Sequence, residues 1–168
     1  ALEYPGGPAI DRLACSGNDR AVLFPKTQLK HVDRNAPHLP GQFDFSFSGL
    51  KTYARNTVEG TELDEQTIAD IAWAFQDAAI DTLVIKCTRA LEKSRRQRLV
   101  IAGGVGANEA LRNRLDTLAM SRGFGLYYPR PAFCTDNGAM IDYAGWGRLV
   151  GGQRDALGFL MFLSSHRM

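Results

Sequence analysis

The sequence contains no apolar run of membrane-spanning length, and no hydrophobic leader of the secretory type opens it. Among its 168 residues there are only three cysteines, Cys15, Cys87 and Cys134, and no metal-site spacing connects them. The formal net charge of +2 is too small to indicate a nucleic-acid-binding protein, although it does not exclude one. These absences favour a cytoplasmic protein with reduced thiols that does not associate with membranes.

Two further absences concern the start of the chain and metal binding. Residue 1 is alanine rather than methionine, so we expect the chain to begin inside a longer one. His31 and His38 lie in a proline-rich loop with no carboxylate or cysteine at ligand spacing, which gives no reason to predict a metal there. The residues that are present, 45% apolar and 23% charged, fit one globular domain.

The most informative stretch runs from residue 99 to residue 115. Residues 99–102 form a continuous apolar run, which predicts a strand buried on both faces. A turn at Gly103 and Gly104 follows, and a helix begins near Asn108. Asn108 has two interpretations: it caps the helix, or it contacts a ligand where the helix N-terminus attracts an anion.

A second glycine turn lies near the start of the chain. Gly6 and Gly7 precede a short helical pattern that Gly17 stops. Asp11 falls one turn into that helix. Its carboxylate could accept two ribose hydroxyls or could simply complement the helix dipole, and the sequence favours neither.

The longest element predicted is an amphipathic helix over residues 64–93, packed against other parts of the protein. Basic residues end it, and such a run usually offsets the helix dipole in solvent, with contact to an RNA phosphate as the alternative. Residues 20–24 could form a short strand. Residues 43–48 alternate aromatic and polar side chains, which predicts an edge strand leading into a helix capped by Ser48.

The last third of the chain adds a strand over residues 124–128 and a helix that ends at Gly151. Asp136 stands at the start of this helix, as its cap or as a ligand; Thr135 could cap instead and free Asp136 for a cation. Only the strands over residues 99–102 and 124–128 are clear, and two strands among the helical segments do not make a self-sufficient sheet. We therefore expect a helix-rich α/β fragment with few strands of its own.

Four motifs together closely resemble the tRNA N6-adenosine threonylcarbamoyltransferase family, once described as O-sialoglycoprotein endopeptidases. They are YPGGP (4–8), FSFSGLKT (45–52), IAGGVGAN (101–108) and CTDNGAMI (134–141). The resemblance implies the two-lobed fold of actin, sugar kinases and heat-shock chaperone ATPases, of which this chain would form the C-terminal part.

The resemblance also implies an activity. The family transfers a threonylcarbamoyl group from threonylcarbamoyl-adenylate to N6 of the adenosine beside the anticodon, in tRNAs that read codons beginning with A. Gly7, Asp11 and Asn108 match positions that hold the nucleoside part of the adenylate. Asp136 matches a ligand of one divalent metal ion, usually iron and sometimes zinc. The expected partners are tRNA and other proteins of this modification pathway.

Two departures from the family's pattern matter. The chain lacks the His-x-x-x-His pair and the Ser-Gly-Gly phosphate loop that the family carries in its N-terminal half. Residues 157–168 read LGFLMFLSSHRM, unlike the family's usual ending. We expect residues 1–156 to be the C-terminal portion of the transferase domain, residues 157–168 to be an atypical tail such as a frameshift produces, and the fragment alone to be inactive.

Three other functions compete with this one. A metalloprotease is the older description, but the sequence has no His-Glu-x-x-His motif. A sugar or carboxylate kinase of the same superfamily would share the glycine turns without requiring the other motifs. A non-catalytic fragment could bind partner proteins through the long helix.

Overall fold

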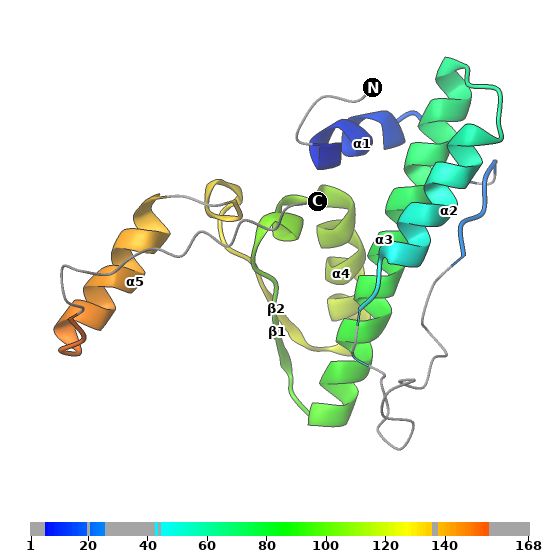
Figure 1. Ribbon diagram of the computed structural model, residues 1–168. Helices are drawn as coiled ribbons and strands as arrows, with labels where there is room; N and C mark the ends of the chain where they lie inside the picture. Colours follow the sequence, from blue (N-terminus) through cyan, green and yellow to red (C-terminus); the bar gives the residue numbers. More distant parts are fainter. Residues whose placement is uncertain (1–5, 20, 26–42, 44, 136–137, 155–168) are drawn as a thin grey trace, which may run out of the picture.

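One long helix, α3 (Glu65–Ser94), forms the centre of the molecule (Figure 1). The computed structural model describes residues 6–19, 21–25, 43, 45–135 and 138–154. The other elements, in chain order, are α1 (Gly6–Ala14), α2 (Ser48–Glu59), β1 (Arg98–Val100), η1 (Gly104–Ala107), α4 (Glu109–Arg122), β2 (Gly125–Tyr127), η2 (Pro131–Phe133) and α5 (Gly138–Val150). No helix in this described part is long and apolar enough to cross a membrane.

Helix α3 confirms the prediction of one long helix over residues 64–93. At its start the Asp64 carboxylate accepts the Thr67 N–H at 2.7 Å, which satisfies an unpaired donor of the first turn. Hydrogen bonds from the Thr67 side chain and from this backbone N–H lower the pKa of Asp64. At its end Arg95 adopts the left-handed conformation, with φ 53°, and stops the helix.

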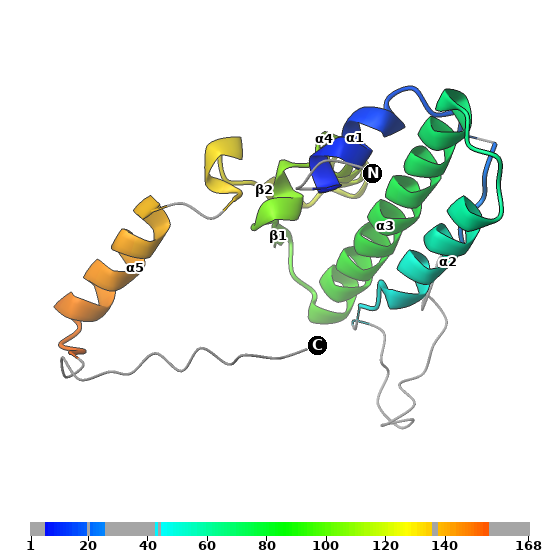
Figure 2. The same ribbon diagram turned by 45° about the horizontal axis from the view of Figure 1, so that its top comes forward.

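The first half of α3 packs against α1 and α2 (Figure 2). The buried apolar side chains between these helices form the first cluster: Phe24, Leu50, Ile71, Ala74 and Ala78. Gly17, just beyond α1, runs so close to α3 that a Cβ there would lie 2.4 Å from the Ala69 carbonyl oxygen. The chain therefore needs glycine at this crossing.

The second half of α3 supports a parallel sheet of two strands. Arg98 pairs with Gly125 and Val100 pairs with Tyr127, and α4 makes the crossover between the strands. The second cluster fills the space between α3, α4 and the sheet: Ile80, Leu111 and Leu115, with Leu99, Ile101 and Leu126 packed against them. The structure is therefore helix-rich α/β, as the sequence predicts.

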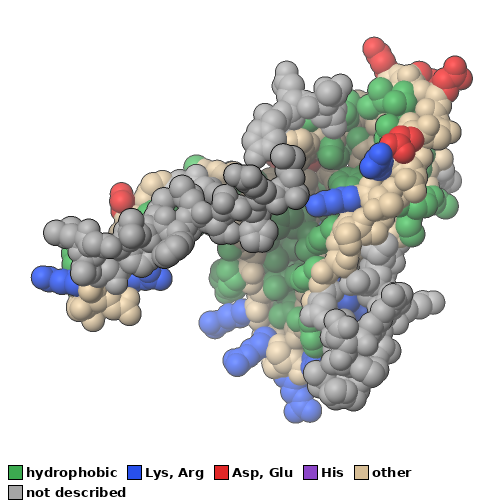
Figure 3. Space-filling view, viewed as in Figure 1, with side chains coloured by type: hydrophobic (Ala, Val, Ile, Leu, Met, Phe, Trp, Pro, Cys, Tyr) green, Lys and Arg blue, Asp and Glu red, His purple; other side chains and the backbone are tan. Residues whose placement is uncertain are grey.

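The prediction that the first strand is buried on both faces is wrong. Val100 is 68% exposed and Tyr127 is 52% exposed, whereas Leu99 packs against the second cluster. Helices α3 and α4 cover only one face of the two strands, so burial alternates along β1. Hydrophobic side chains consequently reach the surface around the sheet (Figure 3).

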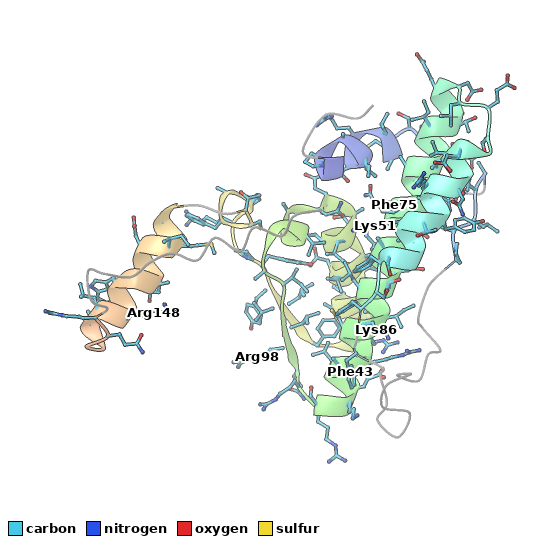
Figure 4. All side chains as sticks on the ribbon, in the orientation of Figure 1. Phe43, Lys51, Phe75, Lys86, Arg98 and Arg148 are labelled. Carbon is cyan, nitrogen blue, oxygen red and sulfur yellow. The ribbon has the colours of Figure 1, made fainter. Side chains whose placement is uncertain are left out.

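The two other predicted strands are also absent from the residues that the structure describes. Residues 21–25 and 45–47 have no strand partner. Val22, Phe24 and Phe47 pack in the first cluster instead, whereas Leu23 is exposed. Phe24 is buried with its ring edge-on to Tyr53 at 5.0 Å. Phe43 lies beside the second half of α3 (Figure 4), where the Lys93 ammonium sits 5.0 Å from its ring centroid.

Ser48 does not cap α2, contrary to the sequence-based expectation. Phe47 takes the cap position, and its carbonyl oxygen accepts the Lys51 N–H at 2.9 Å. Ser48 is the first helical residue, and its hydroxyl pairs with that of Ser46 at 3.0 Å. Packing of Phe47 against the first cluster places the helix start one residue early.

Helix α5 projects away from the other elements (Figures 1 and 2). None of its residues is buried. Its large exposed apolar side chains are Met140, Ile141, Tyr143, Trp146, Leu149 and Val150. A soluble helix is normally apolar on the face that it packs against something else, so α5 lacks a covering surface within the described residues.

Candidate functional site

Three helices meet at the carboxylate of Asp11. Asp11 lies on α1, and its Oδ1 accepts the Nε2–H of Gln76 on α3 at 2.9 Å. The same oxygen accepts the Nδ2–H of Asn108, at the start of α4, at 3.1 Å. These partners are 65 and 97 residues away along the chain, so the contact depends on the whole packing of α1, α3 and α4.

Asn108 uses both ends of its side-chain amide. Its Oδ1 accepts the Leu111 N–H at 2.8 Å, so the interpretation of Asn108 as the helix cap is confirmed. Its Nδ2 donates to Asp11. The cap and the carboxylate together fix the orientation of the amide at the N-terminus of α4, where unpaired N–H groups and the helix dipole favour an anion.

An open cavity of about 360 Å³ lies beside this junction. Asp11 and Gln76 both line it, and the other lining residues are Ala14, Cys15, Gly17, Trp73, Asp77, Ile80, Glu109, Ala110, Asn113 and Arg114. The lining combines an aromatic ring, an amide and charged groups of both signs. Such a mixture is typical of sites for polar organic ligands.

An ion-pair network joins α3 to α4 at this cavity. Arg114 donates to Asp77 at 2.6 Å and also to Asp81. Partial burial alone would lower the pKa of the Arg114 guanidinium, but hydrogen bonds and the charges of Asp77 and Asp81 outweigh it and raise the pKa. Arg114 therefore fastens α4 to α3.

Gly7 lies inside the first turn of α1 rather than in a turn before the helix, which corrects the expectation. A Cβ at Gly7 would meet no atom within 4 Å, so the surface above this backbone is open. Gly103 has φ +81°, which confirms that the predicted turn needs glycine. The backbone at both glycines is thus accessible to a ligand in the described part of the chain.

Arg112 ties the glycine turn to the loop that follows β2. Its Nε donates to the Gly106 carbonyl at 2.5 Å, and one Nη donates to the Pro129 carbonyl at 3.1 Å. The same nitrogen lies 3.4 Å from the buried Cys134 sulfur. The guanidinium also stacks over the Tyr128 ring, 4.6 Å from its centroid. This side chain therefore holds segments from both sides of α4 together.

Asp136, the predicted metal ligand, lies outside the described residues. Within the described part of the chain, no three His, Cys, Asp or Glu side chains converge as a metal site requires. The described residues therefore do not form a metal site by themselves.

Sequence reasoning missed Gln76 and the role of Arg112. Gln76 is polar within the apolar stretch IADIAWAFQDAAI, which is a usable signal of a buried polar contact. Nothing in the local sequence indicates that it faces Asp11, because that contact crosses 65 residues. The local sequence of Arg112 is that of an ordinary exposed helical arginine, because its partners in the loop after β2 are distant along the chain.

A comparison with protein families bears directly on this arrangement. The family model described as TsaD, tRNA N6-adenosine threonylcarbamoyltransferase, matches residues 1–143. The match includes Gly7, Asp11, Gln76 and Asn108, and it covers α1 through the first part of α5. The chain therefore belongs to the TsaD family of tRNA-modifying threonylcarbamoyltransferases.

Proposed function

We propose that this chain holds the nucleoside part of threonylcarbamoyl-adenylate while the threonylcarbamoyl group passes to N6 of the adenosine beside the anticodon. The observation that carries the proposal is the junction of Asp11, Gln76 and Asn108 beside an open cavity. It joins two residues that the family resemblance assigns to the nucleoside with a third that the sequence did not single out.

The chemistry of Asp11 suits a ribose. Both amide donors bind the same oxygen, Oδ1. Among the residues that the structure describes, none donates to the second oxygen, Oδ2, which can therefore accept a hydrogen bond from a ligand. A carboxylate held at one oxygen can accept a ribose hydroxyl at the other, with the strength of a charge-assisted hydrogen bond. Gly7 would let the ligand approach the backbone of α1 closely.

We further propose that residues 1–156 form the C-terminal portion of an actin-like transferase domain and that residues 157–168 are an atypical tail. The parallel β1–β2 pair with one bare face supports this placement, because parallel sheets are normally covered on both faces. Asp136 would supply one ligand of a divalent metal, iron or zinc, together with groups outside this chain.

For the tRNA, we propose a contact at the end of α3. Arg95, Arg96 and Arg98 are exposed there. Figure 4 labels Arg98 beside this end of α3. Guanidinium groups bind phosphate oxygens in pairs of hydrogen bonds, which suits the backbone of a folded RNA.

Two substitutions of Asn108 in the complete gene product test the nucleoside site. Asn108→Ser keeps a side-chain oxygen for the cap but loses the amide donor, whereas Asn108→Ala loses both. We expect both variants to weaken binding of the adenylate by about 1–3 kcal/mol in calorimetry, because a polar partner loses its hydrogen bond. Only Asn108→Ala should also lower the free energy of unfolding, by about 1 kcal/mol.

Unchanged adenylate affinity in Asn108→Ser would show that Asn108 is only a helix cap. An assay of threonylcarbamoyl incorporation into tRNA, run beside a glycoprotein-cleavage assay on the same preparation, decides between transferase and protease. Cleavage without incorporation would contradict the proposal.

A further inference from the structure

We propose that Gln76 is a positioning residue for the nucleoside: it fixes the Asp11 carboxylate so that the site distinguishes ribose from deoxyribose. The inference rests on the proposed function, because it concerns the same adenylate. It assigns a role to a helix α3 residue that lies in none of the four motifs by which the sequence resembles its family.

The first support is the direction of the Gln76 amide. Its Nε2 donates to Asp11 Oδ1 at 2.9 Å, on the same oxygen that binds Asn108. Two donors on one oxygen define the plane of the carboxylate. Oδ2 is thereby held in a fixed direction, which a single donor would not achieve.

The second support is an unsatisfied atom. Gln76 Oε1 is buried and has no hydrogen-bond partner within the described part of the chain. Buried acceptors in native proteins are nearly always paired, so such an atom at a site calls for an explanation. Gln76 lines the cavity, although Oε1 itself is covered in the unliganded chain, so pairing of this atom requires the side chain to adjust when a ligand or a water enters.

The third support is the rigidity of the surroundings. Helix α1 cannot move off α3 easily, since its buried Ala9 and Ala14 pack there and Gly17 touches the α3 backbone. The distance between the Asp11 and Gln76 backbones is therefore set by the fold. The remaining freedom is rotation of the two side chains, which their mutual hydrogen bond removes.

A consequence follows for specificity. Without Gln76, Asp11 retains only its bond to Asn108 and can rotate away from the ligand. The bond to a ribose hydroxyl would weaken, whereas contacts to the base would persist. Sites that bind a substrate hydroxyl reject the analogue that lacks it, so loss of this bond should appear as loss of sugar discrimination.

The experiment measures the affinities of adenosine and 2′-deoxyadenosine for the complete gene product by calorimetry. Both probes are uncharged near neutral pH, so phosphate contacts do not enter. We expect the unmodified protein to prefer adenosine at least tenfold. In Gln76→Ala, and in Gln76→Met, which keeps the side-chain length, the preference should fall below threefold.

Gln66 provides a matched control on the same helix. Its Nε2 links α3 to the segment after α1 by donating to Ser16 O at 3.2 Å, and it also donates to Asp70 Oδ1 within α3 at 2.7 Å. Neither of these partners is Asp11. Gln66→Ala should lower the melting temperature as Gln76→Ala does and should leave the preference for adenosine unchanged. An equal loss of preference in both variants would overturn the inference.

Gln76→Glu adds a pH readout. Two carboxylates in contact share a proton at low pH and repel when both are ionised. Adenosine affinity of this variant should therefore recover at least fivefold between pH 8 and pH 5, with a change below twofold in the unmodified protein.

The two proposals fail in different ways. If the unmodified protein binds adenosine and 2′-deoxyadenosine equally, the role of Asp11 in the proposed function is wrong. If the unmodified protein discriminates and the Gln76 variants discriminate equally well, only the role of Gln76 is wrong.

Discussion

Tyr128 connects the loop after β2 to the middle of α4. Its hydroxyl donates to the Arg112 carbonyl at 3.2 Å, and the Arg112 guanidinium lies over its ring. Burial, with a smaller contribution from the Asp116 carboxylate, raises the pKa of Tyr128 from 10.0 to about 12. The phenol therefore keeps its proton in the folded chain at a pH where the unfolded chain has lost it.

This difference predicts a loss of stability in alkali. The contribution of Tyr128 is complete below pH 10 and disappears as the pH rises from about 10 to about 12, for a total of roughly 2 kcal/mol. In denaturant unfolding experiments, the free energy of unfolding of Tyr128→Phe should fall less steeply between pH 10 and pH 12 than that of the unmodified protein. Tyr143→Phe is the control, since Tyr143 is 73% exposed on α5. An unchanged slope in Tyr128→Phe would contradict the prediction.

Arg114 offers a second test with a matched control. Arg114→Met should lower the free energy of unfolding by about 1–2 kcal/mol, because Asp77 and Asp81 both lose the guanidinium that donates to them. Arg55→Met removes a pair with Glu59 that is mostly in solvent, and it should cost about 0.5 kcal/mol or less. Thermal melts of both variants check the difference, and equal losses would contradict it.

Asp136 can be tested through metal content. In the complete gene product, Asp136→Ala should reduce the bound metal to well below one ion per chain, because a divalent ion loses an anionic ligand. The protein should stay folded, as circular dichroism would show. Elemental analysis after purification measures the metal. A stoichiometric ion retained in this variant would mean that Asp136 serves only as a helix cap.

Single residues were predictable where a local pattern carries the signal. Asn108 was expected to cap a helix or to bind a ligand, and the hydrogen bond that its Oδ1 accepts from the Leu111 N–H confirms the cap. Asp11 was recognised as a candidate, but its contacts with Gln76 and Asn108 were not. Those contacts depend on how three helices pack, and no local spacing encodes that packing.

Helices were more predictable than strands. The periodic apolar positions of α3 predict its limits within a residue, and the start of α4 is predicted as closely, since a helix makes its hydrogen bonds within itself. A strand needs a partner. Residues 21–25 and 45–47 alternate or carry β-branched and aromatic side chains, yet the described structure offers them no neighbouring strand. Val22, Phe24 and Phe47 pack in the first cluster instead.

The surface of the molecule has too much apolar area for an isolated domain. Ile141, Trp146 and Val150 on α5 are exposed, as are Val100 and Tyr127 on the sheet. Expressed alone, residues 1–168 should self-associate at micromolar concentration and bind a hydrophobic dye. Light scattering with dye fluorescence measures this. A monomer that melts sharply and binds no dye would show that these surfaces need no cover.

A substitution pair localises the cause. Changing Ile141 and Trp146 on α5 to Asn and Gln should reduce self-association, because these side chains are 66% and 59% exposed. Changing buried Leu111 and Leu115 to the same residues should increase it, since those side chains hold the second cluster together. If the α5 substitutions leave self-association unchanged, the surface responsible for it lies outside α5.

Both hydrophobic clusters pack on α3, and this determines how the described part of the chain unfolds. Ile71 belongs to the first cluster and Ile80 to the second, and only nine residues of one continuous helix separate them. Loosening either cluster frays the helix that supports the other, so the two cannot unfold as independent units. The amide protons in the middle of α3 are therefore exposed to solvent exchange only when the described core opens as a whole.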